Sequence, residues 1–207
     1  MKKIESNPLL ILISAPSGGG KTTLCNQLLV ARPGMVRAVT CTTRAPRPGE
    51  KDGVDYYFFS AAEFARRVKA DEFIEHATVF ARSYGILKSE LLDKLRSGRD
   101  VLLNVDVQGA ATIRGRVQTE PELKRALVSV FLTPPSIAVL ETRLKNRAAD
   151  SAAEIEKRLA VARQEIAQWK DFDYLVISTS VPEDLRRAMA IVEAEKMREA
   201  RAEAPEF

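Results

Sequence analysis

One short stretch near the N-terminus constrains the fold of this chain more than any other. Residues 9–13 are five consecutive aliphatic residues, a pattern typical of a strand that is buried on both faces of a parallel sheet. A glycine-rich segment follows at once, and residues 21–31 then carry apolar side chains at helical spacing. A buried strand, a tight turn and a helix in this order predict the first unit of an α/β fold.

Strands and helices continue to alternate along the chain. Further strands are predicted at residues 36–39, 56–59, 101–105, 127–132 and 175–177, with one or two short strands within residues 73–80. Helices are predicted at residues 60–70, 88–96, 137–147 and 151–169, in a segment that ends near residue 116, and from residue 180 onward. The alternation predicts a doubly wound parallel sheet with right-handed crossovers. Residues 40–55 are predicted to form a polar loop within an inserted arm of residues 36–87, and residues around 121 a polar connection.

The composition fits one globular domain and excludes several classes of protein. Of the 207 residues, 45% are hydrophobic and 29% are charged, which is too apolar for a disordered chain. The net charge of +4 is too small to indicate nucleic-acid binding. Two cysteines and one histidine exclude a zinc site or a disulfide framework, and residues 9–13 are too short to span a membrane. We therefore expect a soluble protein in the reducing cytoplasm, with no nucleic-acid or membrane partner.

The glycine-rich segment has the pattern of a phosphate-binding loop. Its residues are Ala15, Pro16, Ser17, Gly18, Gly19, Gly20, Lys21, Thr22 and Thr23. Glycines let successive backbone N–H groups point at phosphate oxygens, and the start of the following helix adds partial positive charge. The pattern G-x-x-x-x-G-K-[ST] begins here with Ala15, and a glycine-rich loop with a chance lysine is the simpler alternative. The agreement of strand, turn and helix favours a nucleoside triphosphate site, with Lys21 on the β- and γ-phosphates and the Thr22 hydroxyl on Mg²⁺.

A second basic segment narrows the choice among GTPases, helicases and small-molecule kinases, which a phosphate-binding loop alone leaves open. Arg44 and Arg47 lie within four residues on a loop that is bracketed by prolines. Two guanidinium groups on a stiff loop suit a second phosphate, because arginine binds phosphate oxygens in a bidentate manner. A solvated basic loop is the structural alternative for this segment.

Several blocks together resemble the guanylate kinase family. Besides the loop at residues 14–21, they are TTRAPRPGE at residues 42–50, Tyr56 with Phe58, Phe73 with Glu75, DVQG at residues 106–109 and PPS at residues 134–136. Their order and spacing match over residues 8–190. The resemblance implies a P-loop kinase of purine nucleotide metabolism that uses ATP and Mg²⁺ to phosphorylate GMP, and also dGMP, yielding ADP and GDP.

The resemblance also divides the chain into parts with separate tasks. It implies a single guanylate kinase-like domain over residues 1–207, with a core of residues 1–35, 88–135 and 165–207. Residues 36–87 would form a GMP-binding arm, and residues 136–164 would form a helical lid.

The same resemblance assigns roles to residues on the GMP side. It implies that the phosphate of GMP is held by Thr40, Arg44, Arg47 and Tyr56. It assigns guanine recognition to Glu75, and it places Tyr84, Asn104 and Asp106 in the same site. A carboxylate can accept hydrogen bonds from both the ring N–H and the exocyclic amine of guanine, whereas adenine offers no such pair of donors. A solvated strand residue is the structural alternative for Glu75.

On the lid side, the resemblance implies that arginines act on the transferring phosphoryl group. The residues implied to be catalytic are Lys21, Arg44, Arg143, Arg147 and Arg158. Arg143 and Arg147 lie four residues apart on one predicted helix, so their charges repel each other until an anion binds. For Arg158, a helix pair with Glu154 is the alternative. The acceptor phosphate is already ionised at neutral pH, so we expect no catalytic base.

Three positions depart from the family pattern and keep alternatives open. Asn104 stands in place of Asp, Ile86 in place of a hydroxyl residue at the guanine edge, and Ser178 in place of Asn near the adenine pocket. A nucleoside monophosphate kinase with altered base preference is therefore one alternative. The other is a non-catalytic module that binds phosphorylated peptides, although such modules tend to lose the lysine present here as Lys21. Both a monomer and a homo-oligomer are compatible with the sequence.

Overall fold

The computed structural model describes residues 7–146 and 151–202 of the chain. Its centre is a five-stranded sheet in which all neighbouring strands are parallel. The strands, in their order across the sheet, are β2 (Met35–Arg37), β7 (Asp100–Asn104), β1 (Leu10–Ser14), β8 (Leu127–Thr133) and β9 (Tyr174–Ile177). The predicted parallel α/β architecture is confirmed, with β1 at the centre of the sheet.

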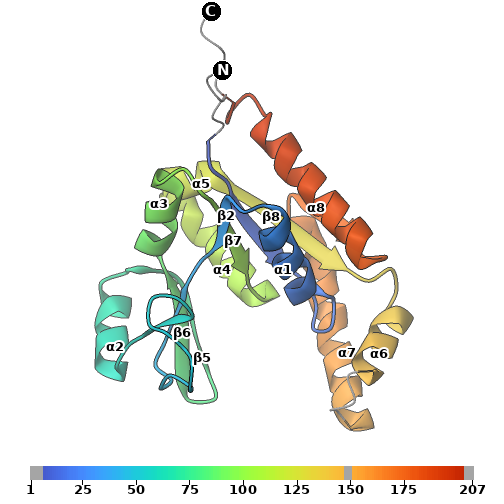
Figure 1. The fold of residues 1–207 in the computed structure, drawn as a ribbon. Coiled ribbons are helices and arrows are strands. Elements are labelled where there is room, and N and C mark those ends of the chain that lie inside the picture. The colour runs from blue at the N-terminus through green and yellow to red at the C-terminus, as the bar shows by residue number, and fades with distance from the viewer. Residues whose placement is uncertain (1–6, 147–150, 203–207) are drawn as a thin grey trace, which may run out of the picture.

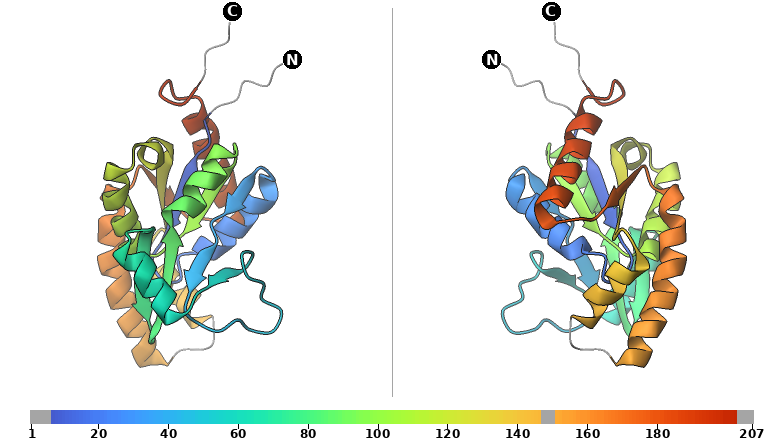
Figure 2. Two further views of the ribbon diagram at one scale, coloured as in Figure 1. Left: turned by 90° about the vertical axis from the view of Figure 1, so that its left-hand side faces the viewer. Right: turned by 90° about the vertical axis from the view of Figure 1, so that its right-hand side faces the viewer.

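Alternate side chains of β1 enter two hydrophobic cores, one on each face of the sheet. Leu10 and Leu12 pack in one core, and Ile11 and Ile13 pack in the other, together with Leu9, which precedes the strand. The first core is covered by α3 (Lys88–Arg96), α4 (Val107–Arg116) and α5 (Pro121–Ala126). The second is covered by α1 (Lys21–Ala31) and α8 (Val181–Lys196), as Figures 1 and 2 show. Burial on both faces is the reason why β1 is apolar from Leu10 to Ile13.

A second, smaller sheet lies to one side of the main sheet (Figure 1). Its strands, in order, are β4 (Tyr56–Phe58), β3 (Thr40–Thr42), β6 (Arg82–Leu87) and β5 (Phe73–Val79). β3 pairs in parallel with β4, whereas β6 is antiparallel to both of its neighbours. Helix α2 (Ala61–Lys69) packs on this sheet through Phe64, whose ring centroid lies 4.5 Å from that of Phe73.

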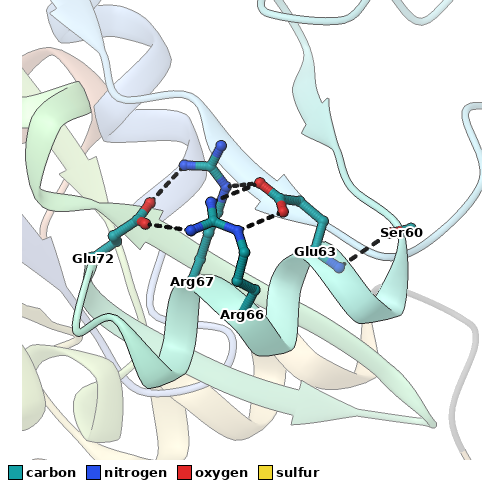
Figure 3. A network of polar contacts seen from close by, with 5 residues as sticks. All are labelled: Ser60, Glu63, Arg66, Arg67 and Glu72. Carbon is teal, nitrogen blue, oxygen red and sulfur yellow. Dashed lines mark hydrogen bonds and ion pairs between the residues drawn. The ribbon is translucent and has the colours of Figure 1, made fainter.

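Helix α2 begins at the predicted serine cap and exposes a network of ion pairs (Figure 3). The Glu63 N–H donates to Ser60 Oγ at 3.1 Å. The Glu63 carboxylate pairs with Arg66 at 2.8 Å and Arg67 at 2.7 Å, and both arginines also reach Glu72. Hydrogen bonds from Arg66, followed by those from Arg67, lower the pKa of Glu63 to about 2. Because the network is on the surface, its contribution to stability is small.

Two further helices form a pair at the opposite side of the main sheet from the small sheet (Figure 1). They are α6 (Ile137–Lys145) and α7 (Ala152–Ala167), and their shared core includes Leu140, Leu144, Ile155 and Leu159. Both begin at the predicted serines, because the Ser136 and Ser151 hydroxyls accept N–H bonds from the first turn. We call α6 and α7 the helical pair.

The structure corrects the sequence prediction at several short elements. Residues 40–55 are predicted to be a polar loop but begin with β3, which is held as a strand by partners on both sides. Strand β6 is not predicted at all, and α5 and the 3₁₀ turn η1 (Val117–Thr119) replace a predicted polar connection. The helix predicted to residue 169 ends at Ala167 and continues as the 3₁₀ turn η2 (Gln168–Asp171). These elements are too short for a periodic signal, so tertiary pairing decides their conformation.

Strand β2 also differs from the predicted strand at residues 36–39. It ends at Arg37 and pairs with β7 in the main sheet, so that the small sheet itself starts at residue 40.

Among the residues that the structure describes, no helix has the length and apolar character needed to cross a membrane.

Candidate active site

The phosphate-binding loop connects the carboxyl end of β1 to the start of α1. Gly18 and Gly20 have φ angles of +84° and +98°, which strongly favour glycine. The Gly19 N–H donates to the Pro16 carbonyl oxygen at 2.8 Å and closes the turn. A cavity of about 270 Å³ lies over the loop, lined by Ala15, Pro16, Ser17, Gly18, Gly19, Gly20, Lys21, Thr22, Thr23, Asp106 and Glu165. All nine predicted loop residues therefore border one cavity.

Lys21 is the first residue of α1 and its side chain lies in this cavity. Its ammonium donates a hydrogen bond to the Val105 carbonyl oxygen at 2.6 Å. Burial lowers the pKa of Lys21, and the nearby Asp106 carboxylate opposes that shift. A half-buried ammonium next to a row of backbone N–H groups makes the cavity suitable for phosphate.

Two carboxylates also line the phosphate cavity. Asp106 caps α4, because its Oδ1 accepts a hydrogen bond from the Gly109 N–H at 2.7 Å. Glu165, near the end of α7, accepts a hydrogen bond from the Ser17 N–H at 3.2 Å. Burial raises the pKa of Glu165, partly offset by the bond from Ser17. The sequence analysis includes Asp106 among the site residues but not Glu165.

A second cavity, of about 370 Å³, adjoins the loop on its other side. It is lined by Gly18, Gly20, Thr23, Leu24, Arg143, Asn146, Ser178, Thr179, Ser180, Val181 and Asp184. Arg143 spans from the loop to this cavity, since its guanidinium donates to the Gly19 carbonyl at 3.4 Å and to Ser178 Oγ at 3.1 Å. The Ser178 hydroxyl in turn donates to Asp184 at 2.6 Å. The small hydroxyl that replaces the expected Asn is thus part of a polar network that holds Arg143.

The second basic site is built on the small sheet. The Arg44 guanidinium donates to both carboxylate oxygens of Glu50, at 2.8 and 2.9 Å, and lies 5.3 Å from the Tyr56 ring centroid. The hydrogen bond to Glu50 is the main reason why the pKa of Arg44 is raised. The Arg47 N–H donates to Glu50 at 2.7 Å, while its side chain is exposed. Glu50 therefore organises this loop around Arg44.

The strand pairing brings the remaining predicted residues of this site close to Arg44. Thr40 lies opposite Tyr56 in the β3–β4 pairing, and Thr42 lies opposite Tyr84 in the β3–β6 pairing. The Tyr56 and Tyr84 rings meet edge to face with centroids 6.5 Å apart. The Arg44 cation thus lies over the Tyr56 ring, with the Tyr84 ring next to it.

Glu75 lies on β5, next to the start of α4. Gly109, in the first turn of α4, lies close to both Glu75 and Asp106. A Cβ atom placed on Gly109 would be 3.7 Å from the Glu75 carboxyl carbon and 3.3 Å from Asp106 Oδ1, so both carboxylates border that helix end. Burial raises the pKa of Glu75 to about 7, with Asp106 adding to the shift and Arg116 opposing it. Asp106 therefore lies between the phosphate cavity and Glu75.

The structure places the other two departures from the family pattern, Ile86 and Asn104. Ile86 lies opposite Glu75 in the β5–β6 pairing and is only 4% exposed, because it belongs to the core under α3 and α4. Packing thus takes the place of a hydroxyl contact at this position. Asn104 ends β7 opposite Ile13, two residues before Asp106. It lies at the same carboxyl edge of the sheet as the phosphate-binding loop.

Of the three arginines predicted on the lid side, the structure describes Arg143 and Arg158. Arg143 reaches the phosphate-binding loop, as described above. Arg147 lies outside the described residues. Arg158 is on the exposed face of α7, and its charge contributes, after hydrogen bonds from Ser151, to the lowered pKa of Glu154.

Two carboxylates that organise the site, Glu50 and Glu165, are not among the residues predicted from the sequence. Glu50 ends the motif at residues 42–50, so its closeness in sequence to Arg44 and Arg47 is a usable signal. Glu165 has no local signal, because its partner Ser17 lies 148 residues away.

Both the fold and the site define a class of protein. A phosphate-binding loop after the central strand of a parallel sheet, with a second basic site on an inserted sheet, is the arrangement of a P-loop nucleotide kinase. The profile of the guanylate kinase family matches residues 7–195. The chain therefore belongs to the guanylate kinase family.

Individual relatives agree with that assignment. The guanylate kinase of Maricaulis maris is 40% identical over 93% of this chain and 86% of the relative. The guanylate kinase of Coxiella burnetii is 44% identical over 91% of this chain and 88% of the relative. The crystal structure of guanylate kinase from Anaplasma phagocytophilum matches with a TM-score of 0.70 at 34% identity, covering 96% of this chain and 92% of that chain.

Proposed function

We propose that the chain transfers the γ-phosphoryl group of ATP to GMP, and also to dGMP, releasing ADP and GDP. The observation that carries the proposal is that one molecule holds two arrangements whose chemistry suits phosphate. One is the loop cavity with Lys21, and the other is the Arg44 site on the small sheet. Two separate sites fit a reaction that brings two phosphorylated substrates together.

The residue roles follow from the chemistry of the acceptor. Because the GMP phosphate is ionised at neutral pH, the enzyme needs to position it and neutralise charge, without a catalytic base. We assign the ATP phosphates to residues 15–23 and the GMP phosphate to Thr40, Arg44, Arg47 and Tyr56. Arg143, Arg147 and Arg158 would neutralise the transferring group, for which arginine contributes about 10³ to 10⁵ in rate.

Glu75 is the proposed reader of guanine. Its carboxylate is half-buried beside Asp106, where it can accept from the two donors on one edge of the base. A buried acceptor of this kind discriminates strongly, because an adenine in its place leaves the carboxylate without partners. Tyr84, Asn104 and Asp106 complete the proposed GMP side.

The residues of the phosphate cavity fit Mg²⁺ as part of a complex with ATP. The described residues contain no cluster of three or more His, Cys, Asp or Glu side chains that could hold a metal. The cavity does offer the Thr22 hydroxyl and the Asp106 carboxylate. Such a set suits Mg²⁺, which binds through few protein oxygens together with substrate phosphates. When bound, Mg²⁺ would neutralise charge on the phosphate oxygens.

We further propose that residues 36–87 act as the GMP-binding arm and residues 136–164 as the lid, joined to one core. Closure of both over the substrates would exclude water that otherwise hydrolyses ATP. We assign the enzyme to the cytoplasm, where ATP is available and where the free thiols of Cys25 and Cys41 stay reduced.

A coupled assay that measures ADP formation with GMP, dGMP, AMP and UMP tests this proposal. We expect turnover with GMP and dGMP and little with the other two. Equal rates with AMP would favour the kinase with altered base preference, and no turnover with any acceptor would favour the phosphopeptide-binding module.

Lys21→Ala tests the phosphate-binding loop directly. We expect loss of GDP formation by at least about 10³-fold, because an ammonium that contacts the phosphates is removed. Circular dichroism is expected to be unchanged, since Lys21 is at the surface of the cavity and makes one hydrogen bond. Undiminished turnover would contradict the assignment.

A further inference from the structure

We propose that Glu165 is an internal competitor for the phosphates of ATP. In the nucleotide-free enzyme its carboxylate accepts a hydrogen bond from the phosphate-binding loop and ties the helical pair to that loop. ATP displaces this carboxylate when it binds. The inference rests on the proposed function, because it takes ATP as the ligand of the loop.

The contact itself is with the backbone that phosphate would use. The Ser17 N–H belongs to the loop and donates to Glu165 Oε2 at 3.2 Å. Glu165 also lines the cavity over the loop, together with Lys21 and Asp106. A carboxylate and a phosphate are both anions that accept from N–H groups, so the two compete for the same donor.

The position of Glu165 does not favour the stability of its own helix. Glu165 lies in the last turn of α7, where the partial negative charge of the helix end disfavours a carboxylate. That turn contains no basic residue to compensate. Burial further raises the pKa of the Glu165 carboxyl. By contrast, Glu154 at the start of the same helix is in a favourable capping box with Ser151.

Other contacts show that the helical pair reaches the loop from both of its helices. A Cβ atom added at Gly18 would lie 2.8 Å from Leu144 and 3.1 Å from Leu140, so α6 packs directly on the loop. Arg143, also on α6, donates to the Gly19 carbonyl oxygen. The Glu165 contact is the corresponding one from α7. Three consecutive loop residues, Ser17 to Gly19, are therefore in contact with the helical pair.

Displacement of Glu165 would couple nucleotide binding to the loss of a hydrogen bond between α7 of the helical pair and the loop. The triphosphate of ATP brings several negative charges next to the two carboxylates of the cavity, and like charges close to each other repel strongly where water is limited. The Asp106 carboxylate is held by its bond from the Gly109 N–H, whereas the Glu165 contact is to the loop itself. Glu165 is therefore the carboxylate that leaves, and α7 loses its hydrogen bond to the loop.

Calorimetry on Glu165→Gln tests the competition. We expect this isosteric variant to bind ATP more tightly by on the order of tenfold when Mg²⁺ is absent, because a like charge is removed from the phosphate site. Adenosine, which has no phosphate, is expected to bind both proteins equally. Glu156→Gln is the matched control, since Glu156 is an exposed glutamate on the same helix, and its ATP affinity should equal that of the wild type.

Several outcomes would overturn the proposal. Unchanged or weaker binding of ATP by Glu165→Gln would do so, as would equal tightening of adenosine. Weaker binding confined to ATP with Mg²⁺ would identify Glu165 as a group that faces the metal instead of a competitor. If the wild type itself fails to bind ATP, the proposed function fails, which is distinct from failure of this inference.

Hydrogen exchange of the Ser17 amide provides a readout that does not depend on affinity. We expect the Ser17 N–H to exchange severalfold faster in nucleotide-free Glu165→Ala than in the wild type, and ATP to restore its protection in both proteins. Equal exchange of the Ser17 amide in the two nucleotide-free proteins would contradict the contact. The Gly19 amide, which donates to the Pro16 carbonyl oxygen, serves as an internal control for an intact loop.

Discussion

At the scale of single residues, Glu75 and Asp106 place two carboxylates at the start of α4. Burial and the Asp106 charge together raise the pKa of Glu75 to about 7. A group with a raised pKa is increasingly protonated as the pH falls through 7, and a protonated carboxyl cannot accept from both guanine donors. The affinity for GMP should therefore depend on pH near neutrality.

We predict that the KM for GMP rises as the pH is lowered from 8 to 6. At one unit below its pKa, only about a tenth of Glu75 is ionised, so the expected rise approaches tenfold, while the KM for ATP changes little. Glu75→Gln serves as the control, because it retains the titration of the GMP phosphate but removes that of the carboxyl. A rise of the same size in Glu75→Gln would show that Glu75 is not responsible.

At the scale of elements, the β5–β6 hairpin has an unusual turn. Val79 pairs with Arg82, so the turn consists of Phe80 and Ala81, whose φ angles are +47° and +61°. Such two-residue turns need positive φ at both positions and favour Asn and Gly. An alanine in this region is strained by about 1 kcal/mol or more. The turn also leaves Phe80 97% exposed.

We predict that Ala81→Gly stabilises the protein by about 0.5–1 kcal/mol, because glycine adopts positive φ without a Cβ clash. Urea unfolding should show a higher midpoint at an unchanged slope. Ala77→Gly, on the exposed side of the same hairpin, is the matched control and should destabilise by a similar amount. A decrease in stability for Ala81→Gly would mean that the strain is relieved in another way.

At the scale of the whole molecule, α4 joins the core to the small sheet. Asp106 begins this helix in the phosphate cavity, and Arg116 ends it at the small sheet. Arg116 donates to the Phe73 carbonyl oxygen at 2.8 Å and to Asp71 at 3.0 Å, which holds the start of β5. Because β5 carries Glu75, we infer that Arg116 is a positioning residue for the proposed guanine site.

We predict that Arg116→Met raises the KM for GMP severalfold and leaves the KM for ATP unchanged. Loss of the nearby positive charge should also move the pH dependence of the GMP KM to higher pH, because Arg116 lowers the pKa of Glu75. Steady-state kinetics from pH 6 to 8 measure both effects. Arg96→Met, which removes a surface ion pair with Glu122, is the control, and a similar KM change there would argue against a specific role.

The core of the fold and the loop chemistry could be predicted from the sequence, because their causes are local. β1 is apolar because it is buried on both faces, α1 spans the predicted residues 21–31, and Lys21 follows the glycines directly. In contrast, β3 exists because β4 and β6 pair with it on either side.

Other features were decided only by the tertiary structure. The contact of Glu165 with Ser17 joins residues 148 positions apart, and that of Arg116 with Phe73 joins residues 43 positions apart. No periodicity or spacing encodes such pairs, since each depends on where packing places a helix end against a loop or strand. The sequence by itself determined which groups are proposed to bind phosphate and guanine, whereas the fold decided which carboxylates stand next to them, because charge interactions act through distance in space.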